Sequence, residues 1–382
     1  MSTIRLLIGT KKAAFIYSSD EGRKTWELSE PMMAGWSVSH VTADFRGETP
    51  RFYAATNHPV WGPSIAKSAD EGATWEQRSE GLGFPKDSGL TIASIWNVIP
   101  GHASEPGVVY AGTAPGGLFK SEDWGATWQG IDAFNGHENR ALWQGIPGGQ
   151  SPVHSIIIDP ADPKHIYLSS SGGGSYVTLD GGERWVMFSH HAKAQTEEAR
   201  VFISQTAAAV PPGWDPASIT DFHHMEMDPK DPNRLWAQAH WGVFRSDDGG
   251  RSWEDVTHMK EPQGLPSFHG FPITVTKREP DAAFVVPLEM GTDNLRTVLG
   301  QFTVYRTRDA GATWEPLTNG LPGPDDFQSC YRESMDTDGL ESEGVYVGTS
   351  NGHVYASIDG GDRWERLPGT LPPILSLTCA VN

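Results

Sequence analysis

One short sequence pattern recurs seven times, and it limits the fold more than any other feature of the chain. Six copies read [ST]-x-D-x-G-x-[TSR]-W, and a seventh at 18–26 carries one extra residue. In each copy we expect the Asp carboxylate to accept backbone N–H groups across a tight turn, the Gly to supply a positive φ, and the Trp ring to be buried. The Asp residues are Asp20, Asp70, Asp123, Asp180, Asp248, Asp309 and Asp359. Residues spread so evenly cannot meet at one site, so the pattern predicts seven structural turns.

Short strand patterns repeat around each turn. Two precede it, as in VVYAGT and GLFKSED, and another follows the Trp before an apolar strand such as SPVHSIIIDP. Four strands per repeat are typical of a propeller blade. The chain begins with a second-strand pattern at Arg5–Gly9 and ends with a first-strand pattern at 374–381, so the last strand is expected to complete the first blade and close the ring. We therefore predict an all-β, single-domain, seven-bladed β-propeller over residues 1–382.

The seven turns resemble the Asp-boxes of the BNR-repeat family. Over essentially its whole length the chain is similar to the bacterial single-domain BNR/Asp-box propellers that are often labelled glycosyl hydrolases or exo-α-sialidases. The resemblance implies the propeller fold and leaves the activity open, because the boxes specify fold and not chemistry. Sialidases are six-bladed and have an Arg-Ile-Pro segment near the N-terminus, which this chain lacks, so sialidase activity proper is not expected. Xyloglucan-cleaving relatives use a cleft between two propellers, and non-catalytic assembly factors share the fold.

Charge and cysteine content exclude several classes of protein. The 48 acidic and 29 basic residues give a net charge of −19, which disfavours a nucleic-acid surface. No apolar run reaches the roughly 18 residues of a membrane span, and the N-terminus has no signal-peptide pattern. Two Cys residues do not make a disulfide framework. We expect a cytoplasmic protein without nucleic-acid or membrane partners and leave its oligomeric state open.

Propeller connectivity predicts where a ligand binds. The Asp-boxes share one face, so function is expected on the opposite face or in the axial channel. That face carries three long loops, at about 129–152, 186–221 and 287–301, and loops of this length are often functional. Its aromatic side chains are expected to contact a sugar or other small organic substrate, with ordinary loop packing as the alternative. The predicted substrate-binding residues are His58, Trp61, His137, Trp143, His240, Trp241 and His269.

A register argument predicts a polar ring on the axis. Counting back thirteen residues from the central apolar residue of each second strand gives His40, Asn97, His154, His223, Phe271 and Glu333. If this offset is equal in all blades, three His and one Glu converge, and such a set suits one divalent transition metal: Fe, Zn, Cu, Ni or Mn. The predicted metal ligands are His40, His154, His223 and Glu333. The predicted catalytic residues are His154, His223, Glu333 and Arg332, and the candidate hydrogen-bonding partners nearby are His224, Glu226 and Arg332.

Three functions remain open on the sequence. The first is an enzyme whose axial metal activates water or polarises a carbonyl, in hydrolysis or lyase chemistry on a small organic or carbohydrate substrate. The second is a metal-free glycoside hydrolase, for which Glu138, Asp221 and Glu289 are further candidate acids or bases. The third is a non-catalytic binding or assembly propeller. No nucleotide cofactor is expected, because the glycines at 172–174 form a turn that no helix follows.

Overall fold

The structure is a computed structural model. It describes residues 2–143, 151–193, 195, 200, 222–258, 262–289 and 300–382. Within these residues the strands form seven four-stranded antiparallel sheets, and the helices are single turns such as α1 (Asp132–Asn135). The all-β, seven-bladed β-propeller predicted from the sequence is therefore confirmed. None of the described helices has the length and apolar character needed to cross a membrane.

The chain divides into two compact units. Unit 1 comprises Met1–Met32 and His223–Asn382, and unit 2 comprises Met33–Phe222. Unit 2 contains three sheets, whose strands are β4 (Ser37–Asp44), β5 (Arg51–His58), β6 (Gly62–Ser68) and β7 (Glu76–Arg78); β8 (Ser94–Pro100), β9 (Val109–Ala114), β10 (Gly117–Ser121) and β11 (Gln129–Gly130); and β12 (Val153–Ile158), β13 (Ile166–Ser170), β14 (Gly174–Thr178) and β15 (Val186–Met187). Its 3₁₀ turns are η1 (Lys86–Ser88), η2 (Glu138–Leu142) and η3 (Ser189–His191).

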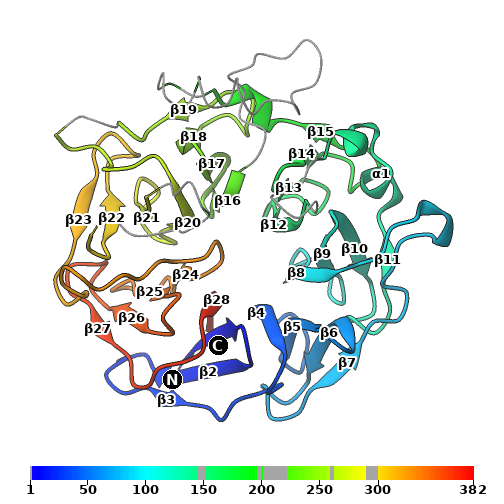
Figure 1. The fold of residues 1–382 in the computed structure, drawn as a ribbon, viewed down its shortest axis with the longest axis horizontal. Helices are drawn as coiled ribbons and strands as arrows, with labels where there is room; N and C mark the ends of the chain where they lie inside the picture. Colours follow the sequence, from blue (N-terminus) through cyan, green and yellow to red (C-terminus); the bar gives the residue numbers. More distant parts are fainter. Residues whose placement is uncertain are drawn as a thin grey trace. The chain divides into compact units, whose positions relative to one another are not determined.

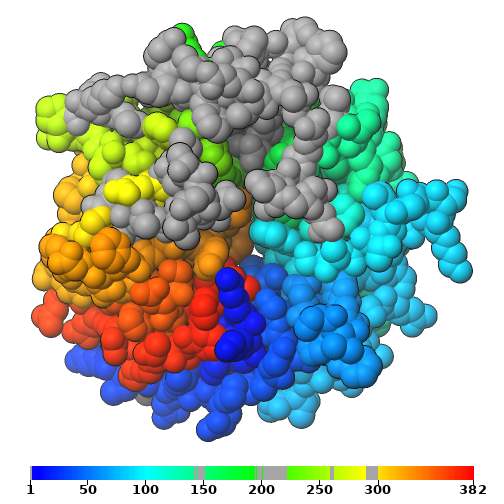
Figure 2. Space-filling view, in the orientation of Figure 1, coloured from blue at the N-terminus to red at the C-terminus, as the bar shows by residue number. Residues whose placement is uncertain are grey.

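Unit 1 contains four sheets, which follow one another in Figure 1. Their strands are β16 (Phe222–Asp228), β17 (Asp231–Ala239), β18 (Gly242–Ser246) and β19 (Glu254–Asp255); β20 (Gly270–Val275), β21 (Ala283–Pro287), β22 (Val304–Thr307) and β23 (Glu315–Leu317); β24 (Met335–Thr337), β25 (Val345–Gly348), β26 (Val354–Ser357) and β27 (Glu365–Arg366); and β28 (Ile374–Val381), β1 (Thr3–Thr10), β2 (Ala14–Asp20) and β3 (Glu27–Leu28). β28 pairs antiparallel with β1, and the two chain ends lie together in Figure 2.

Aromatic residues at the centre of the second strands hold neighbouring sheets together. Tyr53 on β5 is fully buried, and its cluster includes Val98 of β8 and Val109 of β9. Tyr346 on β25 is likewise buried, and it packs with Leu6 and Tyr17 of the sheet that contains the N-terminus. Aromatic and β-branched residues favour strands because their side chains fill the space between pleated surfaces. The same residues that align the repeats in the sequence therefore form the core.

The turns at the repeated Asp residues are closed by side-chain hydrogen bonds. Asp70 Oδ1 accepts the backbone N–H of Thr74 and the hydroxyl of Ser68, both at 2.8 Å, and Oδ2 accepts the hydroxyl of Thr74 at 2.6 Å. Gly72, two positions after the Asp, has a φ of 94°. The hydroxyl of Ser68 accepts the N–H of Gly72 at 2.8 Å. The same bonds recur at Asp123, Asp248 and Asp309.

These bonds predict an acid sensitivity that begins at the turns. The side-chain and then the backbone hydrogen bond from Thr74 lower the pKa of Asp70 to about 2. A carboxylate whose pKa is lower in the folded state than in the unfolded state stabilises the fold at pH values above its unfolded-state pKa of about 4. This stabilisation is lost as the pH falls toward about 2. We expect Asp70→Asn to unfold at lower urea than wild type at pH 7, with a smaller difference near pH 2. Urea midpoints across this range test it, with the exposed Glu48→Gln as control; equal midpoints for Asp70→Asn and wild type at pH 7 would contradict it.

Candidate functional site

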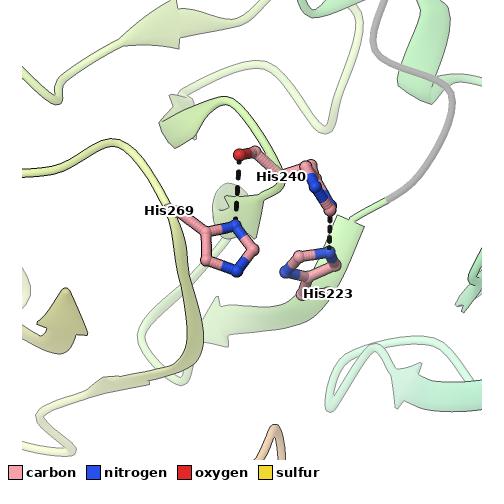
Figure 3. Close-up of side chains that lie close together, drawn as sticks. All are labelled: His223, His240 and His269. Carbon is pink, nitrogen blue, oxygen red and sulfur yellow. Dashed lines mark hydrogen bonds between the residues drawn. The ribbon is translucent and has the colours of Figure 1, made fainter. Parts of the chain in front are cut away.

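Three histidines of unit 1 meet where strand ends and turns come together. His223 lies on β16, His240 follows the last residue of β17, and His269 directly precedes β20. One ring nitrogen from each lies within 4.8 Å of the others, and no other set of three or more possible metal ligands occurs in the part of the chain that the structure describes. Figure 3 shows the three side chains close together, with one dashed line from His223 to the His240 ring and another from His269 to the backbone oxygen of His240. We call these residues the three-histidine cluster.

Hydrogen bonds orient the rings of this cluster. His223 Nδ1 lies 2.7 Å from the carbonyl oxygen of Gly270, so Nδ1 carries the proton and Nε2 is the acceptor nitrogen. His223 Nε2 lies 3.1 Å from His240 Nδ1. His269 Nδ1 lies 3.5 Å from the carbonyl oxygen of His240. Backbone carbonyls therefore orient the rings of His223 and His269, and His223 contacts the ring of His240 directly.

Burial keeps the central ring uncharged. His223 and His269 are 2% and 3% exposed, and His240 is half-buried. Burial, followed by the positive charge of Arg332, lowers the pKa of His223 well below its usual value. The ring of Phe271 stacks on His223 with centroids 4.7 Å apart, and the guanidinium of Arg332 lies 4.5 Å from the Phe271 ring. The predicted catalytic residue Arg332 is thus a cationic neighbour of the cluster.

The next residue of β16 belongs to a different polar group. Successive strand residues point to opposite faces, so His224 faces away from His223. His224 donates from Nδ1 to Glu333 Oε1 and from Nε2 to Glu226 Oε1, each at 3.2 Å. The side chains of His224, Glu333 and Glu226 are 10%, 15% and 30% exposed. We call these three residues the carboxylate–histidine cluster.

The charges of this second cluster are strongly coupled. Burial disfavours a charged imidazolium, but the carboxylates of Glu333 and Glu226 outweigh it and raise the pKa of His224 to about 10. Burial also raises the pKa of Glu226 above its usual range, against the opposing effect of His224. Lys277 and Asp336 form an ion pair at 3.3 Å nearby, and both act on the charge of Glu226. Two carboxyl groups in different environments around one cation are suited to proton transfer.

The equal-offset alignment is wrong by one residue at His154, Phe271 and Glu333. In the last two cases Phe284 pairs with Thr274 and Tyr346 with Asp336, each ten positions back. Tyr53 pairs with Thr42, eleven positions back, whereas Tyr167 pairs with Ile157, ten positions back. The connection between β12 and β13 is therefore one residue shorter, and His154 occupies the bulge between Val153 and Ser155. A single-residue change in a connection shifts every later position in the register. His154 Nε2 lies 2.9 Å from the hydroxyl of Ser171.

The predicted metal ligands fall into different environments. His40 and His154 lie in unit 2, where His40 Nδ1 is 3.0 Å from the carbonyl oxygen of Val98 on the next sheet. His223 and Glu333 lie in unit 1, but Glu333 contacts His224 and is not grouped with His223. The reason is the alternation of β16, which sends residues 223 and 224 to opposite faces. His223 is joined instead by His240 and His269, which were predicted to bind substrate.

The other predicted substrate-binding residues divide between surface and core. Trp61 is 76% exposed, and His58 beside it accepts the N–H groups of Val60 and Trp61 through Nδ1. Trp143 donates its indole N–H to the hydroxyl of Tyr176 at 2.9 Å and packs on Phe134. Ordinary loop packing therefore describes Trp143.

His137 and Trp241 also have packing roles. His137 Nε2 lies 3.1 Å from the carbonyl oxygen of Trp185, and its Nδ1 accepts the N–H of Asn139. Trp241 is buried, 8% exposed, and packs on Phe268 and on the ring of His240. Neither residue presents a broad open ring surface for stacking.

Parts of the predicted loops lie outside the described residues. These parts are 144–150, 194, 196–199, 201–221 and 290–299, and they include Asp221. Glu138 begins the short helix η2, and Glu289 follows β21. Sequence reasoning gave His224 and Glu226 only supporting roles and missed Lys277 and Asp336. The alternation of His224 and Glu226 along β16 was the available signal, because both residues necessarily share one strand face.

Comparisons with known proteins find sequence similarity to xyloglucanases. No protein-family model matches the chain. An oligoxyloglucan-reducing end-specific xyloglucanase of Emericella nidulans is 27% identical over 291 residues, which cover 70% of this chain and 34% of that protein. A xyloglucanase of Paenibacillus sp is 24% identical over 370 residues, covering 90% of this chain and 29% of that protein. The chain thus spans about a third of the length of these curated relatives.

A solved structure agrees with the fold. The crystal structure of an ancestral GH74 enzyme superposes with a TM-score of 0.57 at 17% identity, covering 86% of this chain and 38% of that one. Similarity at this identity supports the propeller fold alone. The chain is therefore a seven-bladed β-propeller whose sequence is similar to xyloglucanases.

Proposed function

We propose that the chain is a glycoside hydrolase that cleaves glucan-type oligosaccharides such as those derived from xyloglucan. The observation that carries the proposal is the placement of Glu226 and Glu333 on the two nitrogens of His224, with both carboxylates partly exposed. Glycoside hydrolysis requires two carboxyl groups, one to protonate the leaving oxygen and one to act on the opposite side of the sugar. The sequence similarity to xyloglucanases supports the choice of substrate class.

The environments of the two carboxyl groups assign their roles. Burial raises the pKa of Glu226, so Glu226 retains a proton more readily and is the general acid. Glu333 is the general base that activates water, and the imidazolium of His224 holds both carboxyl groups in position. The two carboxyl groups contact different nitrogens of the His224 ring. A base that acts through a water molecule inverts the configuration of the sugar. The proposal therefore includes inversion at the anomeric carbon.

A panel of oligosaccharides tests the activity. Purified full-length protein is incubated with xyloglucan, cello- and other glucan oligosaccharides, the products are identified by mass spectrometry, and the first-formed anomer is identified by NMR. We expect cleavage of at least one glucan-type oligosaccharide with inversion. Binding without turnover across the panel would overturn the enzyme assignment, and retention would overturn the assignment of Glu333 as a base that acts through water.

The pH dependence of the reaction follows from the role of Glu226. A general acid is active only while protonated, so kcat/KM is expected to fall as the pH rises through the pKa of Glu226. Since burial raises this pKa above 4.5, the alkaline limb is expected above pH 4.5. Initial rates from pH 4 to 9 on the best substrate locate the limb. Its persistence unchanged in Glu226→Gln would show that another group is the acid.

A further inference from the structure

We propose that His223, His240 and His269 bind a single divalent transition-metal ion, with zinc as the reference ion. This site is separate from the carboxylate–histidine cluster and does not depend on the proposed glycoside hydrolysis. Three imidazole nitrogens from three different segments of unit 1 approach within 4.8 Å of one another. The three side chains lie side by side in Figure 3.

The spacing of the nitrogens is close to that of a metal site. Zinc is bound by His nitrogens at about 2.0–2.1 Å, and tetrahedral geometry then separates neighbouring nitrogens by roughly 3.3 Å. His223 Nε2 and His240 Nδ1 are 3.1 Å apart. A ring nitrogen of His269 lies within 4.8 Å of the other two, so movement of its side chain has to close part of that gap. His240 also has to carry its proton on Nε2, because Nδ1 needs a free lone pair to bind the metal. Binding of one ion by three ligands therefore involves a change in the side chains of His240 and His269.

The second nitrogen of His223 is arranged as in a metal ligand. Metal-binding histidines usually donate their other N–H to a carboxylate or a backbone carbonyl, which fixes the tautomer and the ring orientation. His223 Nδ1 makes this bond to Gly270 at 2.7 Å, and Phe271 stacks on the ring. Nε2 is thus directed at the cluster.

The three imidazole nitrogens determine which metal ions fit the site and which ligand can occupy the remaining coordination position. Three imidazoles with no carboxylate suit zinc, copper, nickel or ferrous iron and not magnesium or calcium, which prefer oxygen. Three protein ligands leave a fourth tetrahedral position open. The cationic side chain of Arg332 lies 4.5 Å from the ring of Phe271, which stacks on His223. The open position is therefore expected to favour a small anion, such as a carboxylate, over a neutral ligand.

Metal titration of the untagged full-length protein tests the site. After dialysis against chelator, zinc and cobalt(II) binding are measured by calorimetry and by the visible spectrum of cobalt. We expect one equivalent to bind to wild type and His240→Gln to bind at least about 100-fold more weakly. His102→Gln, which changes a partly exposed histidine of unit 2, is the matched control and is expected to bind as wild type does.

The variant His240→Cys distinguishes loss of a metal ligand from loss of folding as the reason for weaker metal binding. His240→Cys keeps a zinc ligand, so it is expected to bind cobalt(II) with a new sulfur-to-metal charge-transfer band. Absence of binding in wild type, equal binding in His240→Gln, or binding by His240→Cys without that band would each overturn the proposal. Glycan cleavage is assayed separately, so failure of one assignment does not decide the other.

Discussion

Glu226→Gln is expected to lower kcat on an unactivated oligosaccharide by about 10²–10⁴-fold, because general acid catalysis typically contributes that much. The glutamine keeps the size of the side chain and can still contact His224, but it has no acidic proton to give to the leaving sugar. The same variant is expected to lose far less activity on an aryl glycoside, whose leaving group needs no protonation. Glu333→Gln, in contrast, is expected to be impaired on both substrates, because water still has to be activated. Steady-state kcat and KM on the two substrates separate the roles.

A neighbouring carboxylate provides the control for this experiment. Glu343 accepts the backbone N–H of Lys277 at 2.6 Å, and burial raises its pKa, yet it contacts neither His224 nor Glu333. Glu343→Gln is therefore expected to retain kcat within a few-fold of wild type. A loss in Glu343→Gln as large as that in Glu226→Gln would show that the kinetic effect reports general disturbance of unit 1. Equal losses of Glu226→Gln on both substrates would remove its role as the acid.

The repeated turns explain how much of the fold the sequence could predict. The hydrogen bonds of Asp70 join residues that are two to four positions apart, so the sequence pattern of the turn predicts them directly. The buried Tyr53 and Tyr346 mark their strands in the same way. The register of β12 has no such local signal. It depends on the connection between β12 and β13, which is one residue shorter than the connection between β4 and β5. Chain length alone does not reveal where a strand ends, so the displacement of His154 required the structure.

The site was predictable only in its residue types. His223, Glu333, His240 and His269 were each recognised as candidates, but which of them meet depends on strand faces and on turns that close in three dimensions. The carboxylate–histidine cluster joins β16 to a residue 109 positions away, just before β24. Such long-range contacts have no local signal. The sequence therefore predicts one polar group, whereas the structure places these residues in two clusters.

A second repeated motif links three of the Asp turns to the preceding blade. After the fourth strand of several blades the sequence contains Gly-Leu, and the residue before the Gly accepts the backbone N–H of the next turn's Trp. The three bonds are Trp128 to Glu80 at 2.9 Å, Trp314 to Gln263 at 2.7 Å and Trp364 to Asn319 at 2.9 Å. Leu321 of the last example packs in the same buried cluster as Trp364. The Gly-Leu turn therefore attaches one sheet to the next.

Gly320→Ala is expected to lower the free energy of unfolding by about 2–4 kcal/mol, because it combines backbone strain with a clash. Gly320 has a φ of 89°, and a Cβ at this position would lie 2.0 Å from the carbonyl oxygen of Trp364. That oxygen belongs to the backbone of a buried residue and cannot move without disturbing the bond between Trp364 and Asn319. Gly323→Ala is the control, since Gly323 is three residues away and a Cβ there meets no atom within 4 Å. Urea denaturation of both variants measures the difference. Equal free energies of unfolding for the two variants would show that the Gly-Leu turn accommodates the added Cβ and does not hold the sheets together.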